Sequence, residues 1–442
     1  MPLQKDILKA ELQRADSIDP DRALLLRYAL ASAGLTLFAA TWRLWTPQTV
    51  YPQVPLFGWA CQLPRWLDWC GAGGIVASLL VVLFADPRIR GGAYALGSFA
   101  FCLAGLMLLD QHRIQPWAYQ FLLIAIVLAV LPSGPGIFWL RVLTVSIYFH
   151  SAVTKLDASF LETLGQRFLD VPFGLIQVSI ENWPLPVRGM AAAVFPVGEL
   201  LIAVGLCLPR VRRGALAAAI AMHFAMFLIL GPWGLQHRAG VLIWNVFFAV
   251  QDWILFGRSV SRIAGSASNS PNDVSNAESP VKVSAVRLME GLIVAAVLLP
   301  LLEPWGLWDH WPGWGLYASR AQRVTVFVHE AGRRRLPREI QAFLISTEPS
   351  DPWQRLRIDR WSLDVLAAPI YPQSRFQLGV AAALDRCYGL NEQLEVDIEE
   401  AADRWTGERS RHRLRGGRPL AEACEAYWFN GRPRTNLCPY ES

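Results

Sequence analysis

The sequence predicts an all-α polytopic membrane bundle of about eight or nine transmembrane helices, followed by a small extracytoplasmic α+β domain. Hydrophobic residues make up 53% of the 442 residues, charged residues only 17%, and tryptophan occurs 19 times, which is unlike a soluble protein. Nine apolar stretches have roughly the length that crosses a bilayer. From Glu303 onward the composition becomes that of a soluble domain, with 19 arginines and 19 acidic residues.

The chain is predicted to divide into five segments. The leader mixes acidic and basic residues, and Gly265 to Ser279 is rich in Ser, Asn and Gly without an apolar period, which is typical of a disordered loop. The segments are a cytoplasmic leader at residues 1–26, a transmembrane bundle at 27–258, a disordered cytoplasmic loop at 259–285, a last transmembrane helix at 286–302 and an extracytoplasmic domain at 303–442.

The predicted spans follow the apolar stretches between charged or turn-forming residues. They are Leu30–Trp45, Gly71–Ala85, Gly92–Leu109, Trp117–Leu131, Ile137–Leu156, Met190–Leu208, Gly214–Leu230, Ala239–Phe256 and Val286–Leu302. The connection from Ala158 to Gly189 holds the apolar run VPFGLIQVSIENWPLP, and we interpret it as an amphipathic connector at the membrane interface, with a lid as the alternative.

Basic residues in the short loops indicate the orientation. The loops after the second, sixth and eighth spans are rich in them: Arg88, Arg90, Arg210, Arg212, Arg213, Arg258, Arg262 and Lys282. Those after the first, third and seventh spans hold only Arg65, Arg113 and Arg238. Because Lys and Arg accumulate on the cytoplasmic side, we expect a protein of the inner cell membrane with its N-terminus in the cytoplasm and its C-terminal domain outside.

Within the C-terminal region, RVTVFVHE predicts a strand, while QSRFQLGVAAALDRCYG and LEVDIEEAADRW fit either a helix or a strand followed by a helix. Balanced charge and scattered tryptophans favour packing of this domain on the membrane unit. Five cysteines fall on the expected outer side: Cys61, Cys70, Cys387, Cys424 and Cys438. A disulfide could join the first outer loop to the domain, or two cysteines within the domain.

The fifth span carries a polar stripe that needs an explanation. Its members recur at steps of three and four residues, which places them on one face of a helix: Arg141, Thr144, Tyr148, Ser151 and Lys155. Charges within a bilayer cost at least about 2.5 kcal/mol, so this face must contact protein or water. Only four of the 41 basic residues are lysines, and Lys155 is the only one inside a span. Lysine, unlike arginine, can lose its proton when desolvated and act as a base, although a lysine at a helix end can also reach the headgroups.

Other intramembrane polar residues are weaker candidates. Glu199 follows a Pro and a Gly and is a plausible partner of Lys155. His223 fits an acid–base role or a satisfied core histidine, and Asn245 fits contact between helices. The segment DQHRIQPWAYQ concentrates polar groups beside Trp117 and Tyr119, which suits either an aromatic belt or the mouth of a site.

The segment IYFHSAVTKLDASFLETLG resembles the signature of the horizontally transferred transmembrane (HTTM) family, which includes the membrane domain of the vitamin K-dependent γ-glutamyl carboxylase. VFPVGELLIAVGLCLP, AMHFAMFLILGPWG and DQHRIQPWAYQFLL are similar to neighbouring helices of that family, with an acidic residue followed by a histidine. The resemblance implies that Lys155 deprotonates a reduced quinone, so that oxygen-dependent chemistry can remove a proton from a substrate glutamate for carboxylation. It implies support from Glu199 and His223.

The resemblance also implies a vitamin K-like quinone as cofactor and a peptide or protein as substrate, with Tyr148, Ser151, Trp117, Tyr119 and Asn245 as candidates for cofactor binding. The chain departs from the carboxylase where Thr154 replaces a lysine and Phe160 a tryptophan, so relatives need not keep the same substrate or reaction. A non-catalytic membrane protein that binds a quinone or lipid, or anchors a partner, is the alternative. The small net charge of +5 does not indicate nucleic-acid binding, and the cysteines show no metal-binding spacing.

Overall fold

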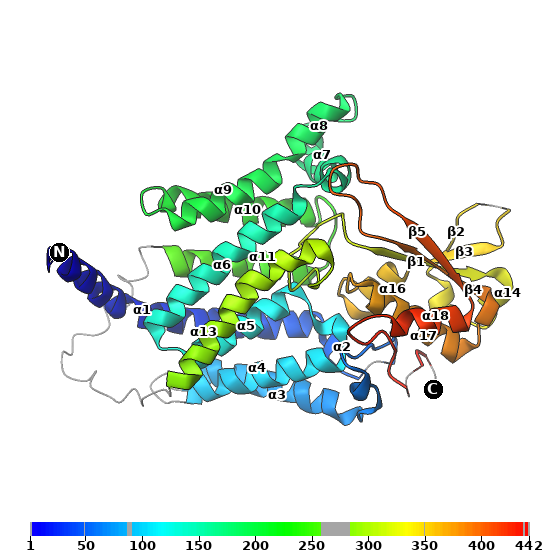
Figure 1. Cartoon of the computed structure of the whole chain (residues 1–442), viewed down its shortest axis with the longest axis horizontal. Helices are drawn as coiled ribbons and strands as arrows, with labels where there is room; N and C mark the ends of the chain where they lie inside the picture. The colour runs from blue at the N-terminus through cyan, green and yellow to red at the C-terminus, as the bar shows by residue number, and fades with distance from the viewer. Residues whose placement is uncertain are drawn as a thin grey trace.

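The computed structural model describes residues 2–47, 49–85, 91–257, 283–348, 350–435 and 438–440. A helical bundle carries a small antiparallel sheet at one end, and the N-terminus lies at the opposite end of the bundle (Figure 1). In this part of the chain eight helices are long and apolar enough to cross a membrane, and α5 is a shorter apolar helix beside them. The structure therefore contains the expected membrane-type bundle, while the predicted loop at Gly265 to Ser279 lies outside the described residues.

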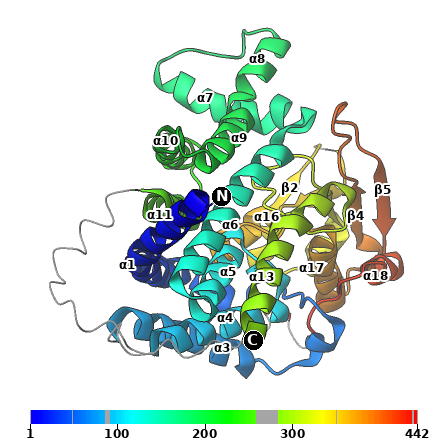
Figure 2. The same ribbon diagram turned by 60° about the vertical axis from the view of Figure 1, so that its left-hand side comes forward.

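The elements of the bundle follow the apolar stretches of the sequence closely. They are α1 (Pro2–Ala40), α2 (Trp42–Trp45), η1 (Gly58–Gln62), α3 (Trp66–Phe84), α4 (Gly91–Leu109), η2 (Gln111–Arg113), α5 (Pro116–Val130), α6 (Ser133–Lys155), η3 (Phe160–Leu164), α7 (Gly165–Leu175), α8 (Leu185–Ala192), α9 (Val194–Cys207), α10 (Arg212–Leu230), α11 (Ala239–Phe256), α13 (Val283–Leu298) and η4 (Leu299–Trp305). Figure 2 shows the helices of this bundle from a second side.

Helix α1 begins before the predicted leader ends, and its apolar span runs from Pro20 to Ala40. Arg22 donates hydrogen bonds of 2.6 Å to the carbonyl oxygens of Leu255 and Gly257. These carbonyls end α11 and have no partner within their own helix. The bundle thus accommodates Arg22 through backbone carbonyls, and the span starts earlier than its charge suggested.

The connection between α6 and α9 is mostly helical. It comprises a π-helical turn, η3, and the helices α7 and α8. Leu169, Ile180 and Ala192 form a small buried cluster that holds these segments together. Most of the apolar run itself is exposed, including Leu175 and Ile176 at 64% and 66%, and Ile180 is its one buried residue.

The C-terminal region forms a five-stranded antiparallel sheet with the order β2-β3-β1-β4-β5, flanked by helices. Its elements are β1 (Arg323–His329), α14 (Glu330–Arg333), α15 (Arg338–Gln341), β2 (Leu344–Ser346), β3 (Trp353–Leu356), α16 (Ile358–Leu366), α17 (Ser374–Tyr388), η5 (Asn391–Gln393), β4 (Leu394–Glu399), β5 (Arg411–Arg415) and α18 (Gly417–Glu425). Strand β1 alternates buried and accessible residues, with Val326 and Val328 fully buried, which confirms the strand predicted from RVTVFVHE.

The two segments whose secondary structure the sequence left open, QSRFQLGVAAALDRCYG and LEVDIEEAADRW, form different elements. The first is a single helix, α17, which ends at Gly389 in the left-handed conformation that terminates many helices. The second is strand β4, and the rest of that segment is not helical. Asp403 accepts hydrogen bonds from the backbone of Trp405 and Thr406 and forms a turn instead, which competes with helix formation.

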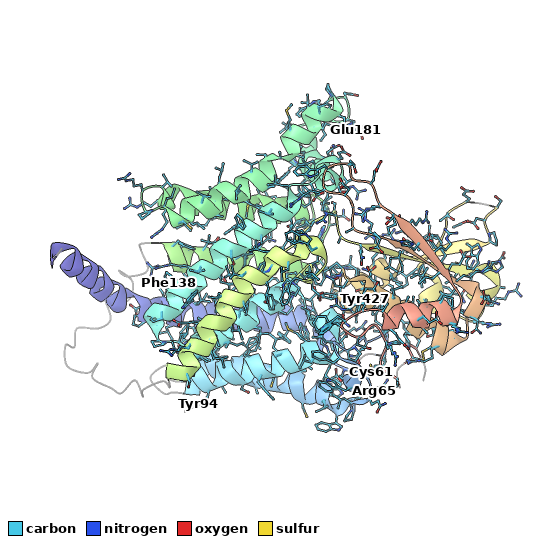
Figure 3. The ribbon with its side chains drawn as sticks, in the orientation of Figure 1. Cys61, Arg65, Tyr94, Phe138, Glu181 and Tyr427 are labelled. Carbon is cyan, nitrogen blue, oxygen red and sulfur yellow. A yellow bond between two sulfur atoms is a disulfide. The ribbon has the colours of Figure 1, made fainter. Side chains whose placement is uncertain are left out.

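The C-terminal region is docked on one end of the bundle through buried charges. Asp68 of α3 lies 2.5 Å from a guanidinium nitrogen of Arg113 and 2.8 Å from one of Arg434, and all three side chains are at most 2% exposed. Figure 3 labels Cys61 and Arg65 at this end of the bundle. The predicted packing of the C-terminal domain on the membrane unit is confirmed.

A disulfide within the C-terminal region joins Cys387 and Cys438, whose Cα atoms are 5.5 Å apart. Cys61, Cys70 and Cys424 are free thiols. The pairing within the domain is therefore the correct alternative, and the loop between α2 and α3 is held to the domain by hydrogen bonds such as Asn430 to the carbonyl of Pro55.

Candidate functional site

The polar stripe of α6 faces the interior of the bundle. Thr144, Tyr148, Ser151 and Lys155 are each at most 4% exposed. Arg141, at the other end of the stripe, donates to the carbonyl of Leu255 and helps to cap the end of α11. The stripe thus contacts protein and not lipid, as its charge required.

Lys155 and Glu199 form a buried ion pair between α6 and α9. The Lys155 Nζ lies 2.8 Å from both carboxylate oxygens of Glu199 and 2.6 Å from the hydroxyl oxygen of Ser151. Lys155 is 3% exposed and the Glu199 side chain 12%. Three acceptors therefore surround the three N–H groups of the ammonium, and the pair is neutral as a unit.

A second cluster lies on the same face of α6, two turns from Lys155. The Tyr148 hydroxyl is 2.7 Å from Nε2 of His223 and 2.5 Å from Oδ2 of Asp252. His223 Nδ1 lies 3.1 Å from Oδ1 of Asn245, and the Asn245 amide donates to the carbonyl of Val241. The Val241 contact orients the amide, so Asn245 presents its oxygen to His223.

The hydrogen bonds of this second cluster are compatible with two arrangements of its protons. Because Asn245 offers an acceptor, Nδ1 of His223 carries a hydrogen. In the first state Nε2 of His223 has no hydrogen, the Tyr148 hydroxyl donates to Nε2, and a protonated Asp252 donates to Tyr148. In the second state Nε2 carries a hydrogen and donates to Tyr148, and the Tyr148 hydroxyl donates to an ionised Asp252. The two states differ only by the position of protons along Asp252, Tyr148 and His223. The cluster can therefore relay a proton without a change in its total charge.

A third network braces the same helices. The Trp244 indole donates to Gln120, Gln120 donates to Gln251, and Gln251 donates to the hydroxyl of Thr144, with distances of 2.6 to 2.9 Å. These side chains connect α11, α5 and α6. They satisfy one another, so we assign them a structural role in holding the two acid–base clusters in place.

The first two clusters open into one small cavity of about 60 Å³. Its lining includes the two candidate bases, Lys155 and His223. It also includes residues hydrogen-bonded to them: Tyr148, Ser151, Glu199 and Asn245. The structure therefore brings together Lys155, Glu199 and His223, which the sequence named separately, with three of the residues named for cofactor binding. A space of this size admits one or two water molecules.

A larger cavity of about 270 Å³ adjoins the small one. The two share Trp244, Leu316 and Tyr317 as wall residues. The lining of the larger cavity is mainly apolar and comes from Thr41, which follows α1, from α5 and α11, and from the C-terminal region. Tyr317 has φ of +59°, a strained backbone for a bulky residue, which often occurs at binding sites.

The aromatic residues near the start of α5 separate into two roles. Trp117 lines the larger cavity. Tyr119 does not line either cavity, and its ring packs against Trp314 at a centroid distance of 5.3 Å. The structure therefore keeps Trp117 near the site and leaves Tyr119 as a packing residue.

The polar segment before α5 docks the C-terminal region. Gln111 accepts from the Arg375 side chain and donates to the carbonyl of Asn430, and His112 is hydrogen-bonded to the carbonyl of Pro369. Burial raises the pKa of Asp110 to about 6, and burial lowers the pKa of His112 to about 3. The density of polar groups in this segment is explained by docking.

The sequence analysis did not identify Asp252 or Tyr317 as site residues. Asp252 lies seven residues after Asn245, two turns along α11, so the two share a face. That spacing, within an otherwise apolar helix, was the available signal. Tyr317 comes from a loop of the C-terminal region, and nothing in its local sequence indicates that it reaches a cavity beside α10.

Comparisons with protein-family models, with curated proteins and with solved structures find no match for this chain. In the described part of the chain, no group of three or more His, Cys, Asp or Glu side chains could hold a metal ion. The functional argument therefore depends on the geometry of the site.

Proposed function

We propose that this chain is an integral membrane enzyme of the vitamin K-dependent carboxylase-like type, in which Lys155 takes a proton from a reduced quinone. The observation that carries the proposal is the buried Lys155–Glu199 pair, set in a cavity beside a proton relay and next to a larger apolar cavity. The resemblance of this helix to the HTTM family supports the same assignment.

Glu199 makes Lys155 a usable base. Transfer of the ammonium proton to Glu199 across 2.8 Å gives a neutral amine and a neutral acid. That transfer removes two charges from a desolvated site, so it costs less than in water, and the pair exchanges protons as a unit. The amine can then accept a proton from a ligand hydroxyl, after which the ammonium stabilises the negative oxygen.

The lining of the larger cavity suits the apolar ring of a quinone, because its walls are mainly apolar and include Trp117, Trp244 and Tyr317. A reduced quinone, when bound, supplies an acidic hydroxyl and, with oxygen, the stronger base needed for carboxylation or related chemistry. Trp244 and Tyr317 belong to both cavities and would orient the ring towards Lys155. His223 and Asp252 would carry the proton away along the relay.

We also propose that the protein lies in the inner cell membrane with its C-terminal domain outside, where a peptide or protein substrate would approach. Three observations support this. The N-terminus and the sheet lie at opposite ends of the bundle (Figure 1). The disulfide between Cys387 and Cys438 suits an oxidising compartment. Trp42, Trp59, Trp66 and Trp69 are all more than half exposed and precede or begin α3 near the docked end, as in an aromatic belt.

The alternative is a non-catalytic protein that binds a quinone or lipid or anchors a partner. It is favoured by the complete hydrogen bonding of Lys155, which is also what a purely structural ion pair shows.

Turnover with quinols separates these functions. The purified protein is mixed with chemically reduced menaquinone or vitamin K, and oxygen consumption is followed with an electrode. We expect consumption that depends on both protein and quinol. Saturable quinol binding without oxygen consumption would favour the non-catalytic alternative, and the absence of both binding and consumption would reject the proposal.

A further inference from the structure

The larger cavity carries an acid–base pair that the Lys155 mechanism does not use. His310 lines this cavity and is 6% exposed, and its Nδ1 lies 2.6 Å from Oε1 of Glu303. Its other ring nitrogen, Nε2, is buried and has no hydrogen-bond partner among the described residues. An unsatisfied buried nitrogen is costly, so Nε2 is available to bind a group that the described chain does not supply.

The partner of Nδ1 decides what Nε2 can do. An ionised Glu303 can only accept, so Nδ1 carries the hydrogen and Nε2 presents a lone pair. A lone pair at this place accepts an O–H group and can take its proton. The imidazolium that forms is stabilised by Glu303, which also fixes the orientation of the ring.

The surrounding backbone holds the ring of His310 in place. A Cβ added to Gly315 would lie 3.1 Å from both Cγ and Cδ2 of His310, so the glycine backbone packs directly on the imidazole. Gly315 also donates its N–H to the carbonyl of His310 at 2.8 Å. Trp314, between them, has φ of +58°. A side chain at 315 would displace the ring, which explains the absence of one.

His310 stands in the wall between two cavities of different character. On one side is the apolar cavity, and on the other is a polar cavity of about 190 Å³ that is also lined by Glu303, Arg320 and Arg375. The polar cavity has room for several water molecules. His310 therefore contacts both an apolar and a polar space.

We propose that Glu303 and His310 form a second general-base site, which binds and deprotonates an amphipathic ligand bearing a phenol-type hydroxyl on an apolar body. The ligand O–H bond breaks, the proton is bound by Nε2, and the electron pair stays on the ligand oxygen. Glu303 balances the charge of the imidazolium. This site does not require Lys155 to be a base.

Fluorescence of 1-naphthol, a small apolar phenol, tests the proposal in the full-length protein in nanodiscs. Excited naphthol gives its proton to a nearby base and then emits as the anion, whereas in apolar surroundings without a base it emits as the neutral form. We expect saturable binding with anion emission in the wild type. His310→Gln should weaken binding by about threefold to tenfold, the effect of one hydrogen bond, and the bound probe should emit as the neutral form.

Three further variants make the result specific. Glu303→Gln, which leaves His310 without its anionic partner, should also lower anion emission. If His310→Gln does not fold, the emission of Glu303→Gln tests the proposal in its place. Ala318→Trp, which fills the larger cavity, should abolish saturable binding. Glu422→Gln, in the exposed pair with Arg418, should leave anion emission unchanged. Anion emission that survives the substitutions of both His310 and Glu303, or that disappears in Glu422→Gln, would overturn the proposal, as would the absence of saturable binding to the wild type.

Discussion

At the scale of single residues, the polar residues of α6 have different roles. Arg141 caps a neighbouring helix, Thr144 ends a bracing network, Tyr148 joins the relay, and Lys155 pairs with Glu199. The spacing of these residues predicted that they share one buried face. It could not predict their partners, because these come from α9, α10 and α11, and contacts between helices depend on packing that a local period does not encode.

His112 gives a prediction for the pH dependence of stability. Its Nε2 is 3.1 Å from the carbonyl of Pro369, and its Nδ1 is buried without a partner among the residues that the structure describes; burial lowers the pKa of His112 from 6.5 to about 3. Between these two values the unfolded chain binds a proton at His112 that the folded chain does not. The contribution of His112 to stability is therefore full above pH 6.5 and is lost as the pH falls towards 3.

Thermal melting at pH 7.5 and pH 5 measures this effect. The raised pKa of Asp110, about 6 compared with 3.8, acts in the opposite direction below pH 6, so the comparison must be with a variant that keeps Asp110. His112→Gln keeps a donor for Pro369 but does not titrate. We expect its melting temperature to fall less than that of the wild type on acidification. Equal falls would show that His112 does not set the acid sensitivity.

At the scale of elements, the nine predicted apolar stretches correspond, in the described part of the chain, to eight helices of membrane length and the shorter α5, because bilayer length and hydropathy act on each stretch alone. The early start of α1 and the turn after β4 were not predicted. Each is set by a specific hydrogen bond, from Arg22 in the first case and to Asp403 in the second. Such contacts override the local pattern.

The junction between α3, η2 and the C-terminal segment should be sensitive to one carboxylate. Asp68→Asn leaves Arg113 and Arg434 buried without a counterion, and breaking a buried pair costs about 3 to 5 kcal/mol. We expect a marked fall in the midpoint of denaturation. The exposed pair Arg418 and Glu422 supplies a control, since Glu422→Gln should have no measurable effect. If both variants unfold like the wild type, the buried cluster does not hold the two parts together.

At the scale of the whole molecule, the sheet region is seated on one end of the bundle and contributes residues to both cavities, including Leu316 and Tyr317. Composition alone predicted that this region packs on the membrane unit. It could not predict that the region completes the site, because charge balance and tryptophan content do not specify which loop enters a cavity. Lys155 lies near this end, since the Arg404 side chain donates to the carbonyl of Val153.

Fusion proteins test the proposed orientation. Alkaline phosphatase is active only outside the cytoplasm, so a fusion after Ser442 should be active and a fusion at Ser270 inactive. The physical reason is the accumulation of arginine in the loops on the Ser270 side. The reverse pattern of activity would invert the topology and would place the docked domain in the cytoplasm.

Substitution of Lys155 tests the central claim most directly, through oxygen consumption by the purified protein with a reduced quinone. Arginine keeps the positive charge and can pair with Glu199, but it cannot give up its proton. We predict that Lys155→Arg and Lys155→Ala both lower turnover by about 100-fold or more, that Lys155→Arg melts closer to the wild type, and that methylamine partly restores Lys155→Ala. Near-normal turnover of Lys155→Arg would contradict the account, because it would make Lys155 a structural partner of Glu199 and not a base.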